Sequence, residues 1–206
     1  MEPQTFASTC IIELPPPNEL GGISLARAIR QRRSVRNFGE HTLTWNDIGQ
    51  LVWAAQGVTD DAMGLRATPS AGALYPLELD VVTPHGVFRY QPTTHTLRQR
   101  MTGDVRAELA RAAYEQRWLT DTSCVFSVVA VIERTARKYG ARAERYVQLE
   151  AGHVAQNILL MAVGLGLSGT PVGAFNDNAV ARTLGLDKGE APLYLVPVGL
   201  PSARST

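Results

Sequence analysis

The stretch RYVQLEAGHVAQNILLMAVGL, residues 145–165, decides the fold. At helical spacing its apolar residues spread over several faces: Val147, Leu149, Val154, Ile158, Leu160, Met161, Val163 and Leu165. A helix that is apolar on most sides is buried on most sides. We therefore expect a helix over about 145–165 that either runs through the centre of the protein or is covered by a second subunit.

Just before this helix, VFSVVAVI at residues 125–132 is almost continuously apolar and β-branched, which predicts a strand buried on both faces. Residues 77–83 and 87–90 predict a hairpin, and residues 193–198 predict the last strand. The remaining helices are expected after Ser24, after Thr44 and over 104–118 and 178–184. The pattern predicts one α+β domain over residues 23–206, preceded by an N-terminal arm over residues 1–22 that contains three consecutive prolines.

The composition is that of an ordinary globular chain: 206 residues, 45% hydrophobic and 19% charged. A net charge of +1 gives no reason to expect nucleic acid or an anionic membrane as a partner. Two cysteines and four histidines without ligand spacing predict neither a disulfide framework nor a metal site. The N-terminus lacks a signal-peptide pattern and the longest apolar run is too short to span a membrane, so we expect a cytoplasmic protein.

Five arginines are clustered near the N-terminus: Arg27, Arg30, Arg32, Arg33 and Arg36. No acidic residue occurs between positions 19 and 40, so the cluster repels itself unless an anion is near. Guanidinium forks with a hydroxyl between them suit a phosphate monoester attached to a polyol. The alternative interpretation is a solvated basic face.

Two segments of small residues, TPSAGALYP at 68–76 and GTPVGAFN at 169–176, would let the backbone approach a flat ligand closely. Both could equally be ordinary loops. Lys138 and Tyr139 follow the predicted buried strand, with Arg142 and Arg145 close behind. A lysine placed among arginines can serve as a base and a tyrosine can relay a proton, whereas the alternative is an exposed lysine at a turn.

Eight segments together carry a resemblance to a known family: residues 14–17, 32–38, 51–57, 69–76, 138–142, 152–157, 171–175 and 197–201. In this order they resemble the flavin-dependent nitroreductase superfamily, and within it the SagB-type azoline dehydrogenases of thiazole/oxazole-modified peptide pathways. The resemblance implies an α+β nitroreductase-like fold with a central mixed or antiparallel sheet flanked by helices. It also implies a homodimer with two FMN molecules at the subunit interface.

Carried over by position, the resemblance assigns roles to individual residues. Those expected to hold the FMN phosphate and ribityl chain are Arg32, Arg33, Ser34 and Arg36, with Arg204 as a second phosphate contact. Those expected to line the flavin from the other subunit are Pro69, Ser70, Ala71 and Gly72. Those expected to offer backbone N–H groups near the isoalloxazine are Pro171, Val172 and Gly173. Lys138 and Tyr139 stand where the azoline dehydrogenases have a catalytic Lys-Tyr pair.

The implied function is oxidation of azoline rings to azoles in a modified peptide, with a cyclodehydratase complex as a partner. Two other interpretations stay open. One is an NAD(P)H-dependent nitroreductase or quinone reductase, and the other is a catalytically idle flavin-fold scaffold of a peptide-modifying complex.

Overall fold

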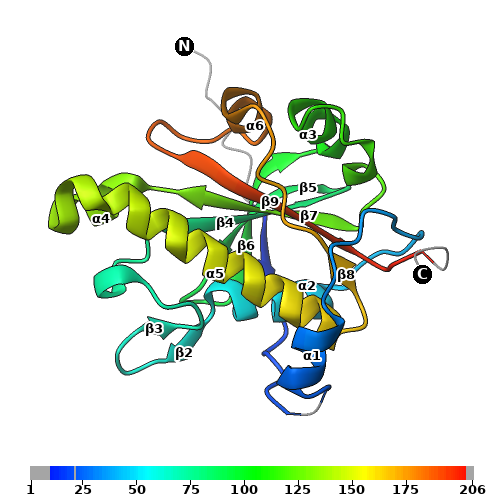
Figure 1. Ribbon diagram of the computed structural model, residues 1–206, viewed down its shortest axis with the longest axis horizontal. Coiled ribbons are helices and arrows are strands. Elements are labelled where there is room, and N and C mark those ends of the chain that lie inside the picture. Colours follow the sequence, from blue (N-terminus) through cyan, green and yellow to red (C-terminus); the bar gives the residue numbers. More distant parts are fainter. Residues whose placement is uncertain (1–9, 21, 203–206) are drawn as a thin grey trace.

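The computed structural model describes residues 10–20 and 22–202, and across them the chain forms a seven-stranded sheet between two layers of helices (Figure 1). Every neighbouring pair of strands runs antiparallel. In spatial order the strands are β1 (Ile11–Glu13), β6 (Thr96–Thr102), β5 (Gly86–Gln91), β4 (Leu77–Thr83), β7 (Cys124–Ala130), β9 (Ala191–Gly199) and β8 (Ser168–Gly169). A separate two-stranded ribbon joins β2 (Val58–Asp60) to β3 (Leu65–Arg66). The predicted α+β fold with a central sheet is confirmed, and the sheet is antiparallel.

The central strands follow the predicted pattern. All seven residues of β7 are buried, because helices cover the sheet on both faces at this strand. In β4, Leu79 and Val81 belong to the core beneath α2 (Trp45–Gln56) and α5 (Ala143–Gly164), whereas Val82 packs on the opposite side. The core on that opposite side includes α3 (Arg106–Ala112) and α6 (Asp177–Thr183).

The long helix predicted over 145–165 is α5, which lies across the sheet and makes most of its core contacts through one side. Leu149 on its outer side is 55% exposed. Within the described part of this chain α5 is therefore buried on its sheet side only, and cover of its outer side by a second subunit stays a prediction. Both predicted helix starts are also confirmed: Ser24 caps α1 (Leu25–Gln31), and Thr44 with Asp47 forms a capping box at α2.

Three predictions of secondary structure are wrong. The helix predicted over 104–118 ends at Ala112, because Tyr114 and Glu115 take left-handed backbone conformations with φ of 55° and 61°. The strand predicted over 125–132 stops at Ala130, and Ile132 begins an unpredicted helix, α4 (Ile132–Tyr139). Strand β6 was missed, since its polar sequence becomes a strand by pairing with β5 and β1.

The predicted arm over 1–22 falls partly outside the described residues, but its later part packs on the sheet. Strand β1 pairs with β6, and Leu14 is buried in the core. His95 Nε2 lies 2.9 Å from the carbonyl oxygen of Pro15, which ties the proline run to the β5–β6 turn. No helix within the described residues combines the length and apolar composition needed to cross a membrane.

Candidate functional site

The arginine segment, residues 32–36, leaves α1 and runs along the C-terminal part of the chain. Ser34 forms a parallel bridge with Gly169 of β8, and the Val35 N–H donates to the Gly169 carbonyl at 3.2 Å. Three residues after Val35, Phe38 forms an antiparallel bridge with Pro201. Residues 32–36 therefore lie beside the small-residue loop at 169–173, as the resemblance implied for parts of one site.

The guanidinium groups of this segment are not paired with carboxylates. Within residues 10–20 and 22–202, no Asp or Glu comes within salt-bridge distance of the five clustered arginines. Arg33 folds back and donates to the carbonyls of Arg30 and Arg32 at 3.0 and 2.8 Å, so it closes the end of α1. The Arg36 guanidinium lies 6.0 Å from the centre of the Trp118 ring. Arg32 and Arg36 thus keep their donors for an anion, which is the chemistry that a flavin phosphate requires.

The loop at 171–173 is pinned to β9. The Val172 N–H donates to the Leu195 carbonyl at 2.8 Å, and Val172 accepts from the Leu195 N–H at 3.0 Å. Proline has no N–H. Of the three residues expected to offer backbone donors, only Gly173, which is exposed, can present one.

The second half of the candidate site joins the other small-residue loop to the Lys-Tyr pair. Lys138 and Tyr139 occupy the last turn of α4 rather than a turn after a strand, which corrects the sequence interpretation. A Cβ atom built on Gly72 would lie 2.8 Å from Lys138 Nζ and 2.8 Å from Tyr139 Oη. Lys138 Nζ lies 5.5 Å from the centre of the Tyr139 ring, which in turn packs edge-on against Tyr146. The structure therefore brings both candidate catalytic side chains onto the backbone of Gly72.

Residues 70–75 form a tight turn with an unusual backbone. Gly72, Ala73 and Tyr75 all take left-handed conformations, with φ of 64°, 52° and 46°. Two hydrogen bonds close the turn: the Tyr75 N–H donates to Ser70 Oγ at 2.9 Å, and the Ala73 N–H donates to the Ser70 carbonyl at 3.0 Å. Non-glycine residues in this conformation cost about 1–3 kcal/mol each, so the surroundings must hold the turn.

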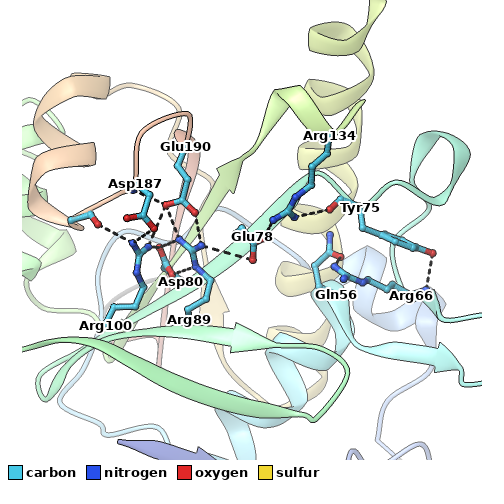
Figure 2. Close-up of polar contacts among 11 residues, drawn as sticks. Gln56, Arg66, Tyr75, Glu78, Asp80, Arg89, Arg100, Arg134, Asp187 and Glu190 are labelled. Carbon is cyan, nitrogen blue, oxygen red and sulfur yellow. Dashed lines mark hydrogen bonds and ion pairs between the residues drawn. The ribbon is translucent and has the colours of Figure 1, made fainter. Parts of the chain in front are cut away.

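Sequence reasoning missed the residues that hold this turn (Figure 2). The backbone N–H of Arg66 donates to Tyr75 Oη at 3.0 Å, and its guanidinium lies 4.5 Å from the centre of the Tyr75 ring. Arg134 Nη1 donates to the Tyr75 carbonyl at 3.1 Å, and Arg66 Nη1 donates to Gln56 Oε1 at 3.2 Å. No sequence motif marks these contacts, which bring residues of α2, β3 and α4 together around the turn.

Arg134 also links the turn to a buried ion network on the sheet. It pairs with Glu78 of β4, whose carboxylate lies 3.8 Å from Arg89. Arg89 bonds both Asp80 and Glu190 at 2.5 Å. Burial raises the pKa of Asp80, and its hydrogen bonds with Arg89 oppose the increase. A polar cleft of about 550 Å³ lies beside these charges. Because the charges are paired with one another, we assign them a structural role: they hold β4, β5 and β6 against the segment that leads into β9.

One chain does not bring the two halves together. The arginine segment contacts β8, just after the C-terminal end of α5, whereas Lys138 lies just before its N-terminal end. The 22 residues of α5 make it about 33 Å long. Figure 1 shows α1 and α4 at opposite ends of this helix. Arg204, the second expected phosphate contact, lies outside the described residues.

The sequence model of the Nitroreductase family matches residues 29–200, which span both halves of the site. The chain belongs to the nitroreductase family. As a family member it shares 43% identity over 200 residues with a candidate nitroreductase of Methanocaldococcus jannaschii, covering 94% of this chain and 98% of that protein. A candidate nitroreductase structure from Ralstonia eutropha matches with a TM-score of 0.82 at 25% identity, covering 94% of this chain and 90% of that one.

This nitroreductase-family chain is also similar to McbC, the microcin B17-processing protein of Escherichia coli. The identity is 25% over 162 residues, covering 72% of this chain and 59% of McbC. The solved McbBCD microcin synthetase complex with truncated pro-MccB17 bound contains a chain that matches with a TM-score of 0.73 at 25% identity, covering 91% of this chain and 76% of that one. The nitroreductase-like fold and membership of an oxidoreductase family are therefore established.

Proposed function

We propose that this protein is an FMN-dependent, SagB-type dehydrogenase that oxidises azoline rings to azoles in a modified peptide. The observation that carries the proposal is the packing of Lys138 and Tyr139 on Gly72, inside a loop that the resemblance assigns to the flavin. The similarity to McbC, whose solved structure is a synthetase complex with a bound peptide precursor, supports a peptide substrate and a complex with partner enzymes such as a cyclodehydratase.

The residues of the first half fit FMN. Arg32 and Arg36 supply unpaired guanidinium groups for the phosphate, Ser34 is an exposed hydroxyl for the ribityl chain, and Gly173 supplies an N–H. When bound, FMN accepts a hydride equivalent from the substrate. Aromatising an azoline ring removes that hydride and one proton from ring carbons, so the enzyme must supply a proton acceptor. Lys138 and Tyr139 are the pair that takes the proton.

A homodimer completes this site. Because the two halves lie at opposite ends of α5 in one chain, a second copy in the opposite orientation would place its Gly72 and Lys138 beside the arginine segment of the first. The surface beside α1 and α5 suits such a partner. It carries a groove of about 590 Å³ lined in part by Leu160 and Met161, and Leu25 and Ile29 of α1 are more than half exposed.

A second candidate function is reduction of nitro compounds or quinones with NAD(P)H, favoured by the 43% identity to a candidate nitroreductase over nearly its whole length. Turnover with matched substrates separates the two. We expect purified protein to be yellow, to release FMN on denaturation and to convert an azoline-containing peptide to the azole. Turnover of nitro compounds with NAD(P)H and no action on azolines would favour the second function, and a folded protein that binds no FMN would exclude both.

A further inference from the structure

Glu150 of α5 is a buried acidic residue with no role in the site described so far. Its exposed fraction is 3%, and its Oε1 atom has no hydrogen-bond partner among the described residues. Around it lie Gln56 of α2, Arg66 of β3 and Ser70 of the 70–75 turn, of which Arg66 is the charged neighbour. An uncompensated buried carboxyl is costly, so its retention in the middle of a core helix calls for a local reason.

The polar groups around Glu150 form a buried cluster between α5 and the 70–75 turn. Ser70 Oγ accepts the Tyr75 N–H, which leaves its own hydroxyl proton available to the Glu150 carboxyl, whose pKa Ser70 lowers. On the other side, Gln56 Oε1 accepts from Arg66, and the buried Gln56 Nε2 makes no hydrogen bond within the described chain. Arg66 connects this cluster to the turn, because its backbone N–H donates to Tyr75 Oη.

We propose that Glu150 is a positioning residue that locks the left-handed 70–75 turn onto α5 and thereby sets where Gly72 meets Lys138 and Tyr139. The proposal rests on the proposed function for the purpose of the turn, although the contacts that hold the turn do not depend on flavin. Helix α5 packs on the main core along its buried side, and Glu150 is the buried acidic residue on that side whose pKa is affected by Ser70.

Because Glu150 is buried and ionisable, its role can be followed through the pH dependence of the turn, which an uncharged side chain would not show. Desolvation raises the pKa of Glu150 to about 7, while Ser70, Arg66 and Gln56 oppose the increase. Its charge therefore changes near neutral pH, and any property that depends on the turn should change with it. Glu150→Gln keeps the shape and the acceptor for Ser70 but removes this titration, whereas Glu150→Ala removes both.

Hydrogen exchange of the full-length protein, read by mass spectrometry, tests the hold on the turn. We expect Glu150→Ala to speed exchange of the Ala73 and Tyr75 amides by about tenfold or more. Glu150→Gln should lie close to wild type. The matched control is Glu144→Gln, an exposed glutamate on the same helix, which should leave these amides unchanged. Unchanged exchange in Glu150→Ala, or an equal effect spread over the whole chain, would overturn the proposal. If Glu150→Ala does not fold, Glu150→Asp, which shortens the side chain but keeps the carboxyl and the Ser70 acceptor, should reproduce the local effect.

FMN binding tests the consequence for the site. The dissociation constant of FMN is measured by fluorescence quenching between pH 6 and pH 8.5, together with the visible spectrum of bound flavin. We expect the dissociation constant of FMN to depend on pH differently in wild type and in Glu150→Gln around pH 7. The FMN phosphate titrates in both proteins, so it does not contribute to this difference. Superimposable profiles would overturn the inference. A wild type that binds no FMN would overturn the proposed function instead, while the exchange measurement still decides whether Glu150 holds the turn.

Discussion

Gly72 lies against the end of the Lys138 side chain: a Cβ on Gly72 would come within 2.8 Å of Lys138 Nζ, so the end of this side chain would have to move. The two residues are 66 positions apart in sequence and belong to different elements, the 70–75 turn and the end of α4. The amine of Lys138 therefore lies beside the backbone that, in the proposed function, lines the flavin.

Replacing Gly72 with alanine should therefore separate the pair from the turn. The left-handed φ of 64° adds a backbone cost of about 1–2 kcal/mol, and the new methyl group also displaces Lys138 and Tyr139. We expect azoline oxidation to fall by at least about tenfold, since displaced catalytic groups lose their geometry. The matched control is Gly64→Ala, which has a φ of 63° and open space around the position, so it should lose similar stability in urea unfolding but keep activity.

Arg36→Ala should weaken FMN binding. A charge-assisted phosphate contact is worth about 1.5–3 kcal/mol, which corresponds to roughly tenfold or more in the dissociation constant. Fluorescence titration of the apoprotein measures it. Arg27→Ala removes an exposed arginine from the same cluster, five residues before Arg32, and should leave the affinity within about twofold because long-range surface charges are screened by salt. Equal losses in both variants would mean that the cluster acts only through its overall charge.

Lys138→Ala should lower azoline oxidation by about 10²–10⁴-fold, the usual contribution of a positioned acid or base, while FMN and the oligomeric state are kept. Tyr139→Phe should lose a similar or smaller factor, because it removes only the hydroxyl. Arg137→Ala changes an exposed neighbour on the same helix and serves as the control. Wild-type oxidation rates in both Lys138→Ala and Tyr139→Phe would show that neither residue has a catalytic role.

A mixed dimer tests whether the two halves of a site come from different chains. At an FMN concentration well below the dissociation constant of Arg36→Ala, this variant and Lys138→Ala each impair both sites of a homodimer, but a heterodimer of the two variants contains one intact site. Mixing them by co-expression or by unfolding and refolding should restore about a quarter of wild-type activity, because half of the randomly assembled dimers carry one working site of two. Recovery would be nil if each chain built its site alone.

The stability of the fold should depend on pH through Glu150. Its folded-state pKa of about 7 is above the ordinary value of 4.5, so its contribution is fully present below about pH 4.5 and is lost as the pH rises through 7. Relative to Glu150→Gln, the wild type should lose at most about 3 kcal/mol of unfolding free energy between pH 4.5 and pH 8.5. Urea unfolding across this range measures the difference in unfolding free energy between wild type and Glu150→Gln. A difference that does not change with pH would mean that Glu150 is already ionised in the folded protein at pH 5.

Much of the fold could be predicted because its signals are local. The N-cap residues Ser24 and Thr44 predict the starts of α1 and α2, and the apolar run that ends at Ala130 predicts the central strand β7. What could not be predicted has no apolar pattern or motif of its own in the sequence. Strand β6 exists through pairing with β5, and α3 ends early at the left-handed Tyr114.

The candidate site shows the same division. Sequence motifs identified the arginine segment, the two small-residue loops and the Lys-Tyr pair. They did not predict how far apart these parts lie in the folded chain. The roles of Arg66, Arg134 and Glu150 around the 70–75 turn follow only from the tertiary contacts. Similarly, the loss of the Val172 N–H as a free donor follows from its pairing with Leu195 on β9.

The contacts between the arginine segment and the C-terminal part of the chain limit when this part of the protein can fold during synthesis. Ser34 is held by Gly169, and Gly39 donates to the carbonyl of Leu200 at 2.9 Å, so residues near the start of the chain wait for residues near its end. A ribosome must release almost the whole polypeptide before these contacts can form. The arginine segment of the nascent chain therefore reaches its final position only after synthesis is nearly complete, and in the proposed function FMN would bind after that point.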